Sequence, residues 1–480
     1  MKVYFAAFEA LPFVKTGGLA DVVGSLPSYY DKKIEVTTIL PFYHFLKEKL
    51  LDKTQHLVHL YVKSGILEEE CDVYTLQHAG TEYRFIDSPT FFDRNGIYGY
   101  EDDAARFAFF GAAVIEMMCR LEEFPDIIHT HDYHTAPLIA LCKLGKHHVE
   151  RVYAIKHVFT IHNLSFQGIY DKQILFDYLD LDREDYDNGT LRFNDGINYM
   201  KIGIVLADAV TTVSKTYARE ILEPSGGQGL DTVLQYRQDD LYGIVNGIDE
   251  SFFNPKSSFV RYPYSIRNVF KEKKKNKLFL QQELGLEEGE DIFLVGMVSR
   301  LTSQKGIELL INGAERMIRQ GVEIAVLGTG ETRLEYALKT LCRKFPGRTA
   351  YTCGYNERLA HQMYAGLDML LMPSLYEPCG LSQLIAMHFG TVPFVRETGG
   401  LRDTVEAFNE YTDSGTGFSF GPYNQTDFNH VFDYAYEQYL DHPDRWHKIV
   451  RNGMKKDVSF AEPAAEYEKV YRKVTGNEEV

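Results

Sequence analysis

Short runs of β-branched and aromatic residues alternate along the chain with stretches of helical periodicity, which is the pattern of parallel α/β units. Five runs in the first half are predicted to be strands, at residues 3–8, 34–40, 126–129, 157–161 and 209–213. Five more follow in the second half, at residues 293–297, 323–327, 349–352, 369–372 and 391–395. Two such series predict an α/β fold of two Rossmann-like, doubly wound domains, each binding ligands at the carboxyl ends of its strands.

The boundary between the two series is predicted at the Asn-Gly turn within residues 243–249, because such dipeptides mark turns. We therefore expect an N-terminal domain at 1–245 and a C-terminal domain at 246–460. An amphipathic stretch near the end predicts a helix, so we expect segment 461–480 to pack back on the first domain. The basic run at 271–275 is typical of a solvated helix face.

Composition narrows the classes of partner. The net charge of −17 over 480 residues disfavours nucleic acid, which binds basic surfaces, so any phosphate site must be a local basic pocket. The six cysteines form no C-x-x-C pair, which favours the reduced thiols of a cytoplasmic protein. No apolar run is long enough to span a membrane, and the apolar start is too short for a signal peptide. The sequence leaves the oligomeric state open.

The first candidate site follows the first predicted strand and reads Lys15-Thr16-Gly17-Gly18-Leu19-Ala20-Asp21-Val22-Val23. A helix is predicted to begin near Gly18. Glycines at a strand-to-helix turn let backbone N–H groups approach a phosphate, and Lys15 adds a positive charge. Close packing explains a bare Gly-Gly turn equally well, so the pattern alone leaves both interpretations open.

Taken whole, this nine-residue string resembles the signature of the glycogen and starch synthases that use ADP-glucose, a family with the GT-B glycosyltransferase fold. The resemblance continues in order along the chain to about residue 405. The other matching segments are HDYH at 131–134, FTIHNL at 159–164, VSRLTSQKG at 298–306, EPCGLSQ at 377–383 and TGGLRDT at 398–404.

The resemblance implies two domains that face a deep cleft, with the glucan acceptor on the N-terminal domain and the nucleotide sugar on the C-terminal one. It implies retaining transfer of glucose from ADP-glucose to the non-reducing end of an α-1,4-glucan, in glycogen synthesis. No cofactor is implied, because basic residues neutralise the leaving diphosphate in this family. The choice of ADP over UDP rests on the resemblance alone.

Four residues are predicted to be catalytic. Arg300 and Lys305 flank a short loop after a strand, so both side chains can converge on one diphosphate. Negative charge grows on the phosphate as the sugar leaves, and preorganised cations there lower the barrier. By resemblance, His162 contacts the transferred glucose, while Glu377 grips glucose hydroxyls and favours positive charge at the anomeric carbon.

The resemblance also implies a set of substrate-binding residues. They are Lys15, Gly18, Asp21, Tyr98, Asn163, Asn246, Tyr355, Cys379, Gly380, Leu381 and Ser382. Tyr355 is expected to stack on adenine, with a packed aromatic as the alternative, and Tyr98 to face glucose or acceptor. Many members of the wider superfamily carry a second acid eight positions after Glu377; here Ile385 stands there, which weakens any argument from paired carboxylates.

No metal site is predicted, although several histidines lie near strand ends. We expect His129 and His131 to point to opposite faces of their strand, and no carboxylates or cysteines join them at ligand spacing. The acidic segment Asp180-Leu181-Asp182 is expected to be a helix cap or a solvated segment rather than a nucleotide–metal clamp.

Two other functions remain as alternatives. One is a phosphorylase-like enzyme of the same fold, which degrades glucan with phosphate and pyridoxal phosphate; such enzymes are typically much longer. The other is a non-catalytic glucan-binding subunit, which the set of Lys15, Arg300, Lys305 and Glu377 disfavours.

Overall fold

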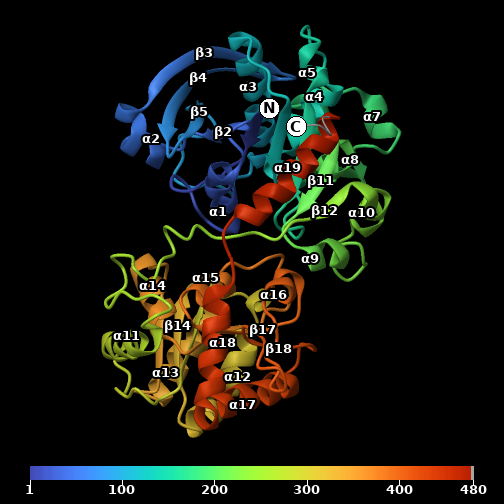
Figure 1. Cartoon of the computed structure of the whole chain (residues 1–480). Coiled ribbons are helices and arrows are strands. Elements are labelled where there is room, and N and C mark those ends of the chain that lie inside the picture. Colours follow the sequence, from blue (N-terminus) through green and yellow to red (C-terminus); the bar gives the residue numbers. More distant parts are fainter. Residues whose placement is uncertain (477–480) are drawn as a thin grey trace. The chain divides into compact units, whose positions relative to one another are not determined.

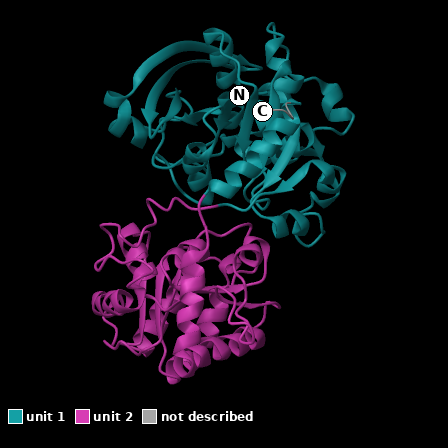
Figure 2. Cartoon of the chain, viewed as in Figure 1, with its two compact units in different colours: residues 1–246, 460–480 teal, residues 247–459 magenta. Residues whose placement is uncertain are grey.

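The computed structural model describes residues 1–476, which form two compact units. Unit 1 combines residues 1–246 with the segment from residue 460 onward, and unit 2 is residues 247–459 (Figures 1 and 2). The chain therefore passes between the units twice, after Asn246 and after Ser459. Each unit is an α/β structure around a sheet in which parallel pairs predominate, so the predicted fold class is confirmed.

Unit 1 is built on a nine-stranded sheet with the order β12-β11-β7-β6-β1-β2-β5-β4-β3. Its strands are β1 (Lys2–Ala6), β2 (Glu35–Pro41), β3 (Gln55–Ser64), β4 (Leu67–His78), β5 (Thr81–Asp87), β6 (Ile127–His131), β7 (Lys156–Ile161), β11 (Ala209–Thr212) and β12 (Leu241–Gly243). All neighbours are parallel except at one end, where β3, β4 and β5 pair antiparallel. A small antiparallel sheet joins β8 (Ile169–Asp171), β10 (Gly196–Asn198) and β9 (Arg192–Phe193).

The helices of unit 1 vary widely in length. They are α1 (Gly18–Ser25), α2 (His44–Leu50), α3 (Asp103–Leu121), α4 (Ala136–Leu144), α5 (Arg151–Ala154), α6 (Gln173–Asp177), α7 (Arg183–Asp187), α8 (Tyr199–Leu206), α9 (Lys215–Glu220), α10 (Asp231–Tyr236) and α19 (Ala461–Thr475). Helix α3 is largely buried, and Gly111 lets it approach α4 because a Cβ there would crowd the backbone of Leu138. Helix α19 packs against β7 and the short 3₁₀ turn Leu26–Tyr29.

Unit 2 is built on a six-stranded parallel sheet with the order β15-β14-β13-β16-β17-β18. The strands are β13 (Leu294–Val298), β14 (Glu323–Gly328), β15 (Thr349–Cys353), β16 (Met369–Met372), β17 (Val392–Arg396) and β18 (Phe418–Phe420). The helices are α11 (Val269–Leu284), α12 (Ile307–Arg319), α13 (Thr332–Lys344), α14 (Glu357–Gly366), α15 (Ser382–His388), α16 (Gly399–Thr404), α17 (Gln425–Asp441) and α18 (Pro443–Lys455). One continuous hydrophobic core joins sheet and helices, for example through Val295, Leu310 and Phe394.

The strand order reverses once in the parallel part of each sheet. In unit 1 the chain moves outward from β1 to β2 on one side and from β6 to β7, β11 and β12 on the other. In unit 2 it moves from β13 to β14 and β15, then restarts beside β13 at β16. Ligands of doubly wound sheets bind beyond the carboxyl ends of the strands at such a reversal. The loops after β1, β6, β13 and β16 are therefore the places to look for a site.

The ten strands predicted from periodicity are all present within two residues of the expected bounds. Helices α1 and α19 begin where the sequence predicted helices. The expected solvated face at 271–275 is only partly right. Lys273 donates to the carbonyls of Tyr364 (3.2 Å) and Ala365 (3.1 Å), and burial lowers its pKa to about 7. The Lys273 amino group therefore forms hydrogen bonds inside unit 2 instead of facing solvent.

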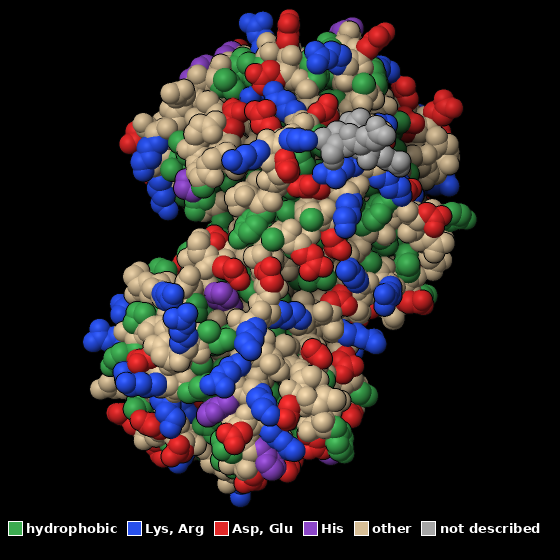
Figure 3. All heavy atoms as spheres, viewed as in Figure 1, with side chains coloured by type: hydrophobic (Ala, Val, Ile, Leu, Met, Phe, Trp, Pro, Cys, Tyr) green, Lys and Arg blue, Asp and Glu red, His purple; other side chains and the backbone are tan. Residues whose placement is uncertain are grey.

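Acidic and basic side chains are interspersed over the face of the molecule seen in Figure 3. This mixture fits the expectation that positive charge for a phosphate ligand must be local rather than spread over a broad surface. Among the helices of residues 1–476, none combines the length and the apolar character needed to cross a bilayer.

Candidate active site

The loop after β1 is tied to Glu9, a buried residue just beyond the strand. The carboxylate of Glu9 accepts hydrogen bonds from the backbone N–H and the hydroxyl of Thr16 and, at 2.9 Å, from the hydroxyl of Tyr98. The space beside Gly17 is open, because a Cβ built there meets no atom of unit 1 within contact distance. Glu9 therefore holds the residue before the Gly-Gly turn, while the space beside Gly17 stays open. A turn that binds phosphate through its backbone N–H groups requires such an open space.

Lys15 and Asp21 from the same signature form an ion pair. Nζ of Lys15 lies 2.8 Å from Oδ1 of Asp21, which is buried in the first turn of α1. Burial raises the pKa of Asp21, while the nearby ammonium opposes that rise. The pair holds the Lys15 ammonium at the start of α1, where Gly18 is the first helical residue.

Asp132, directly after β6, holds the loop that follows β7. Its Oδ1 accepts hydrogen bonds from the backbone N–H groups of His162 (3.0 Å) and Asn163 (3.5 Å). Burial raises the pKa of Asp132 to about 8. Its backbone has a positive φ of 63°, a strained conformation of the kind that clusters at functional sites. The Asn163 side chain accepts from the backbone N–H of Ser165 at 3.1 Å, which completes a tight turn.

His129, His131 and His162 are packed against one another in the interior of unit 1. The expectation for His129 and His131 is wrong: residues two apart in a strand share a face, and these rings stack with centroids 4.2 Å apart. Nδ1 of His131 lies 3.1 Å from Nε2 of His162. Burial lowers the pKa of His162 and His134 to about 3, so both are neutral near neutral pH. The His134 ring stacks on Tyr98 at 4.5 Å.

In unit 2 the loops after β13 and β16 meet through an ion pair. Nζ of Lys305 lies 2.6 Å and 2.9 Å from the two carboxylate oxygens of Glu377, which is 6% exposed. Ser374 donates to the same carboxylate at 3.1 Å. Gly306, at φ 69°, lets the Lys305 loop pass Pro373, whose carbonyl oxygen a Cβ would hit. Arg300 is exposed and has no acidic partner within residues 1–476.

Comparison with known proteins identifies the family of the chain. Residues 2–236 match the family described as the starch synthase catalytic domain, and residues 277–453 match glycosyl transferases group 1. The chain is 42% identical to a glycogen synthase of Clostridium beijerinckii over 481 aligned positions that cover all of both chains. It is 43% identical to that of Caldicellulosiruptor saccharolyticus, covering 99% of this chain and 100% of the relative.

This chain belongs to the glycogen synthase family.

A solved structure gives the same result for the fold. The catalytic domain of starch synthase IV from Arabidopsis thaliana, bound to ADP and acarbose, matches with a TM-score of 0.90 and 30% identity over 99% of each chain. The two Rossmann-like units of the family are therefore those of the GT-B fold, as predicted.

Within this glycogen synthase fold, the loops after β13, β14 and β15 are linked by backbone hydrogen bonds. Leu301 N–H donates to the carbonyl of Thr329 (2.8 Å), and Gly354 N–H donates to that of Gly328 (3.1 Å). Tyr355 directly follows Gly354, and 75% of its surface is exposed. The alternative of a packed aromatic is therefore wrong for Tyr355.

The turn after Glu377 is shaped by its neighbours. The N–H of Gly400 donates to the Glu377 carbonyl at 3.2 Å, and the Gln383 amide donates to the carbonyls of Cys379 (3.1 Å) and Gly380 (2.8 Å). Leu381 precedes α15, which begins at Ser382. The predicted substrate-binding residues 379–382 thus lie together beside the Lys305–Glu377 pair.

Asn246 is buried at the end of unit 1, three residues after the carboxyl end of β12, and its contact with the substrate stays a prediction. Asp182 precedes α7 and pairs with Lys146 at 2.8 Å, with both side chains exposed, which fits the expected solvated segment. Within residues 1–476, no group of three or more His, Cys, Asp or Glu side chains is arranged to hold a metal ion.

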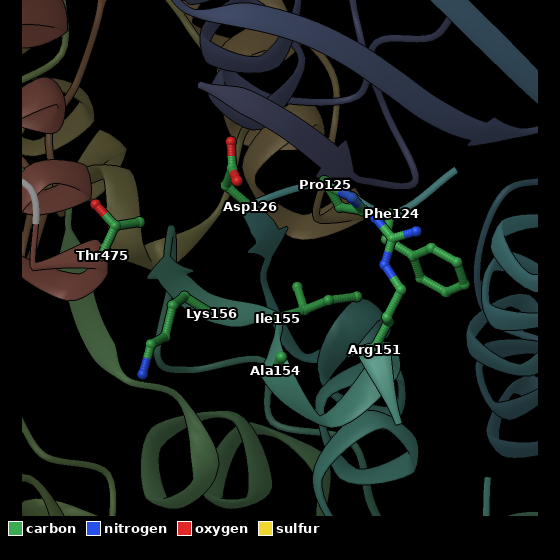
Figure 4. A pocket seen from close by; sticks show the side chains of 8 residues that line it. All are labelled: Phe124, Pro125, Asp126, Arg151, Ala154, Ile155, Lys156 and Thr475. Atoms are coloured by element: carbon green, nitrogen blue, oxygen red, sulfur yellow. The ribbon is translucent and has the colours of Figure 1, made fainter. Parts of the chain in front are cut away.

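A pocket lies at the amino ends of the unit 1 strands, opposite to the ends that carry the candidate site (Figure 4). Asp126 and Lys156 line it at the amino ends of β6 and β7, whereas His162 follows the carboxyl end of β7. Because ligands of this fold bind at the carboxyl ends, the pocket is not part of the candidate site.

Glu9 and Asp132 are site residues that sequence reasoning did not assign. Both carboxyl groups lie shortly after a buried strand at the reversal of strand order, Glu9 three residues after β1 and Asp132 directly after β6, and Asp132 lies inside a segment already matched to the family. A carboxyl at that position is the signal that could have identified them.

Proposed function

We propose that this chain is a retaining glucosyltransferase that moves glucose from ADP-glucose to the non-reducing end of an α-1,4-glucan during glycogen synthesis. The observation that carries the proposal is the Lys305–Glu377 pair at the reversal of the unit 2 sheet, in a chain aligned end to end with glycogen synthases. The proposed division of labour gives the nucleotide sugar to unit 2 and the glucan acceptor to unit 1.

The leaving diphosphate is assigned to Arg300 and Lys305. When the bond between the anomeric carbon and the phosphate oxygen breaks, negative charge grows on ADP, and preorganised cations stabilise it most in the transition state. Arg300 supports this role because it is a cation without an acidic partner in the described part of the chain. Lys15, held by Asp21 at the start of α1, is assigned to donor phosphate as well.

The sugar is assigned to the loops beside these cations. Glu377 and residues 379–382 would contact glucose hydroxyls, with Tyr355 against adenine. His162 and Tyr98 would contact the glucose from unit 1. The acceptor hydroxyl attacks the face from which ADP departs and passes its proton to the leaving phosphate, so the α configuration is retained. An exposed Tyr355 ring supports the adenine contact because stacking needs an accessible face.

A side-by-side assay tests the proposal. Incorporation of labelled glucose into glycogen should be clearly faster from ADP-glucose than from UDP-glucose. Equal or faster use of UDP-glucose would overturn the donor assignment, and no incorporation from either would overturn the enzyme assignment.

Chelation provides a second test. If Arg300 and Lys305 neutralise the diphosphate, turnover should survive exhaustive treatment with EDTA. Loss of turnover that Mg²⁺ or Mn²⁺ restores would show that a cation shares this task.

The alternative functions find no support in the comparisons. The two full-length relatives named above are glycogen synthases, and no observation favours a phosphorylase or a non-catalytic subunit.

A further inference from the structure

A line of buried rings and hydroxyls joins helix α19 to His162 inside unit 1. The hydroxyl of Tyr471 in α19 lies 2.7 Å from Nδ1 of His129, whose Nε2 lies 2.6 Å from Oγ1 of Thr160. The His129 ring stacks on that of His131, and Nδ1 of His131 lies 3.1 Å from Nε2 of His162. His131 is therefore the last member of this line before the candidate site.

The position of the His131 ring is set by the core rather than by the site loop. His131 is the final residue of β6, which pairs with both β1 and β7. Besides the stack on His129, its ring packs at 5.0 Å from that of Phe5 in β1. Nδ1 of His131 is thus held at one place, and the His162 ring meets it there.

The three histidines are neutral near neutral pH. Burial lowers the pKa of His162 to about 3 and holds those of His131 and His129 well below their usual range. A neutral imidazole carries a single N–H. The hydrogen between Nδ1 of His131 and Nε2 of His162 therefore belongs to one ring or the other, and that choice sets the tautomer of both.

Nε2 of His131 distinguishes the two arrangements. It is buried and has no hydrogen-bond partner within residues 1–476. If His162 were the donor, His131 would carry its own hydrogen on Nε2, as a buried donor without an acceptor. If His131 is the donor, Nε2 holds only a lone pair. Orphaned buried N–H groups are rarer in proteins than orphaned acceptors, which favours donation by His131.

We propose that His131 is a positioning residue that donates from Nδ1 to Nε2 of His162 and so holds His162 in the tautomer with its hydrogen on Nδ1. Within the described residues Nδ1 of His162 has no hydrogen-bond partner. It is not one of the fully buried polar atoms that lack a partner. Its N–H is left for a ligand. On the proposed function, on which this last step rests, the acceptor is a hydroxyl of the transferred glucose.

The tautomer can be read from the full-length protein without substrate. In protein labelled with ¹⁵N-histidine, a long-range ¹H–¹⁵N correlation separates protonated from bare ring nitrogens, and His162→Gln assigns the His162 signals by their loss. We expect Nδ1 of His162 to be protonated and Nε2 to be bare. The opposite pattern in the wild-type protein would overturn the proposal.

Two variants of His131 test whether it imposes the tautomer. Nδ2 of Asn is bonded to Cγ as Nδ1 of His is, so His131→Asn can donate at the same place, whereas the Gln amide is one bond further out. His131→Asn should keep the His162 tautomer. His131→Gln should give a mixture and lower kcat/KM for ADP-glucose roughly tenfold relative to His131→Asn, about the worth of one hydrogen bond.

His157→Asn is the matched control, because His157 is equally buried, lies in the adjacent strand β7 and has neither ring nitrogen partnered within residues 1–476. It should leave the His162 spectrum unchanged. Equal tautomers and equal kcat/KM in both His131 variants would overturn the role of His131. If neither variant folds by circular dichroism, the wild-type spectrum still decides. An inactive wild-type enzyme with the expected tautomer would refute the proposed function but not the positioning.

Discussion

The loops at the two strand reversals are held in different ways. In unit 1 the His162 loop is held by the carboxyl of Asp132 and the ring of His131, both buried. In unit 2 the loops meet through the charged pair of Lys305 and Glu377, and Arg300 stands exposed beside them. The loop in unit 1 is held by buried groups that are mostly neutral, whereas the loops in unit 2 carry charged side chains.

This difference separates two contributions to catalysis. Groups that keep their charge state and their place supply orientation, which is set before substrate arrives. Cations near the departing phosphate supply electrostatic stabilisation that increases as the reaction proceeds. Removing a cation from the unit 2 site should therefore act mainly on kcat among the kinetic constants, whereas removing Lys15 from unit 1 should act mainly on binding.

The largest effect is expected for Lys305→Ala, which removes a cation and leaves Glu377 buried without its partner. The kcat should fall on the order of 100-fold or more. The free energy of unfolding should also fall, on the order of 3 kcal/mol, because breaking a buried ion pair leaves one charge uncompensated. Steady-state kinetics and urea denaturation measure the two effects.

Glu377→Gln added to Lys305→Ala provides the control. The double variant should regain most of the lost stability and none of the lost kcat. Wild-type stability in Lys305→Ala alone would contradict the assignment of a structural role to the pair.

Arg300→Ala should lower kcat by a similar factor, on the order of 100-fold, without the loss of stability. Its side chain is exposed and has no acidic partner in the described chain, so the unfolding free energy should change by less than about 0.5 kcal/mol. Arg319→Ala, at an exposed position of α12, should alter neither quantity. A wild-type kcat in Arg300→Ala would remove it from the leaving-group site.

Acid should destabilise unit 1 before unit 2. Buried His129, His131, His134, His157 and His162 all have lowered pKa values. Below about pH 6.5 these histidines become protonated in the unfolded chain but stay neutral in the folded protein. Each therefore contributes stability that is present above that pH and is lost as the pH falls, by up to about 1.4 kcal/mol per pH unit.

Hydrogen exchange between pH 7 and pH 5 measures this difference, because it reports the two units separately. Asp132 acts in the opposite direction, since its raised pKa favours the folded state as acid is added. His157→Asn should reduce the acid sensitivity of unit 1. Equal loss of protection in both units would contradict the expected contrast.

The smallest effect is expected for Lys15→Ala. Lys15 is assigned to donor phosphate that is charged before the reaction begins, so on this proposal its loss should raise the KM for ADP-glucose about tenfold and lower kcat less. Buried Asp21 then lacks its counter-ion and takes up a proton more readily. Lys15→Arg, which keeps the charge, should retain most of the affinity. A loss confined to kcat would assign Lys15 to the transition state instead.

Periodicity along the sequence was sufficient for the fold. Each buried strand of a doubly wound sheet is a short apolar run, so its position is written locally in the chain, as for β7 and β14. The residues beside Glu377 could also be predicted, because they share one contiguous segment.

Contacts between distant segments were harder to predict. Asp132 meets the amide of His162 only because β6 and β7 are neighbours in the sheet, which no local pattern states. The basic run in α11 predicts a solvated face because its charge is visible in the sequence, whereas the carbonyls that accept from Lys273 lie about ninety positions away. The stacking of His129 on His131, by contrast, follows from the period of a strand, because side chains two residues apart lie on the same face.

The return of α19 to unit 1 has a consequence during synthesis on the ribosome. Residues 1–246 emerge first, but Tyr30 and His129 wait for the hydroxyl of Tyr471, which is translated only after the whole of unit 2. Unit 2 is contiguous in sequence and can complete its core in one passage from the exit tunnel. A nascent chain therefore finishes its first unit last, and one that stops before residue 460 leaves the line of contacts behind His162 open at its far end.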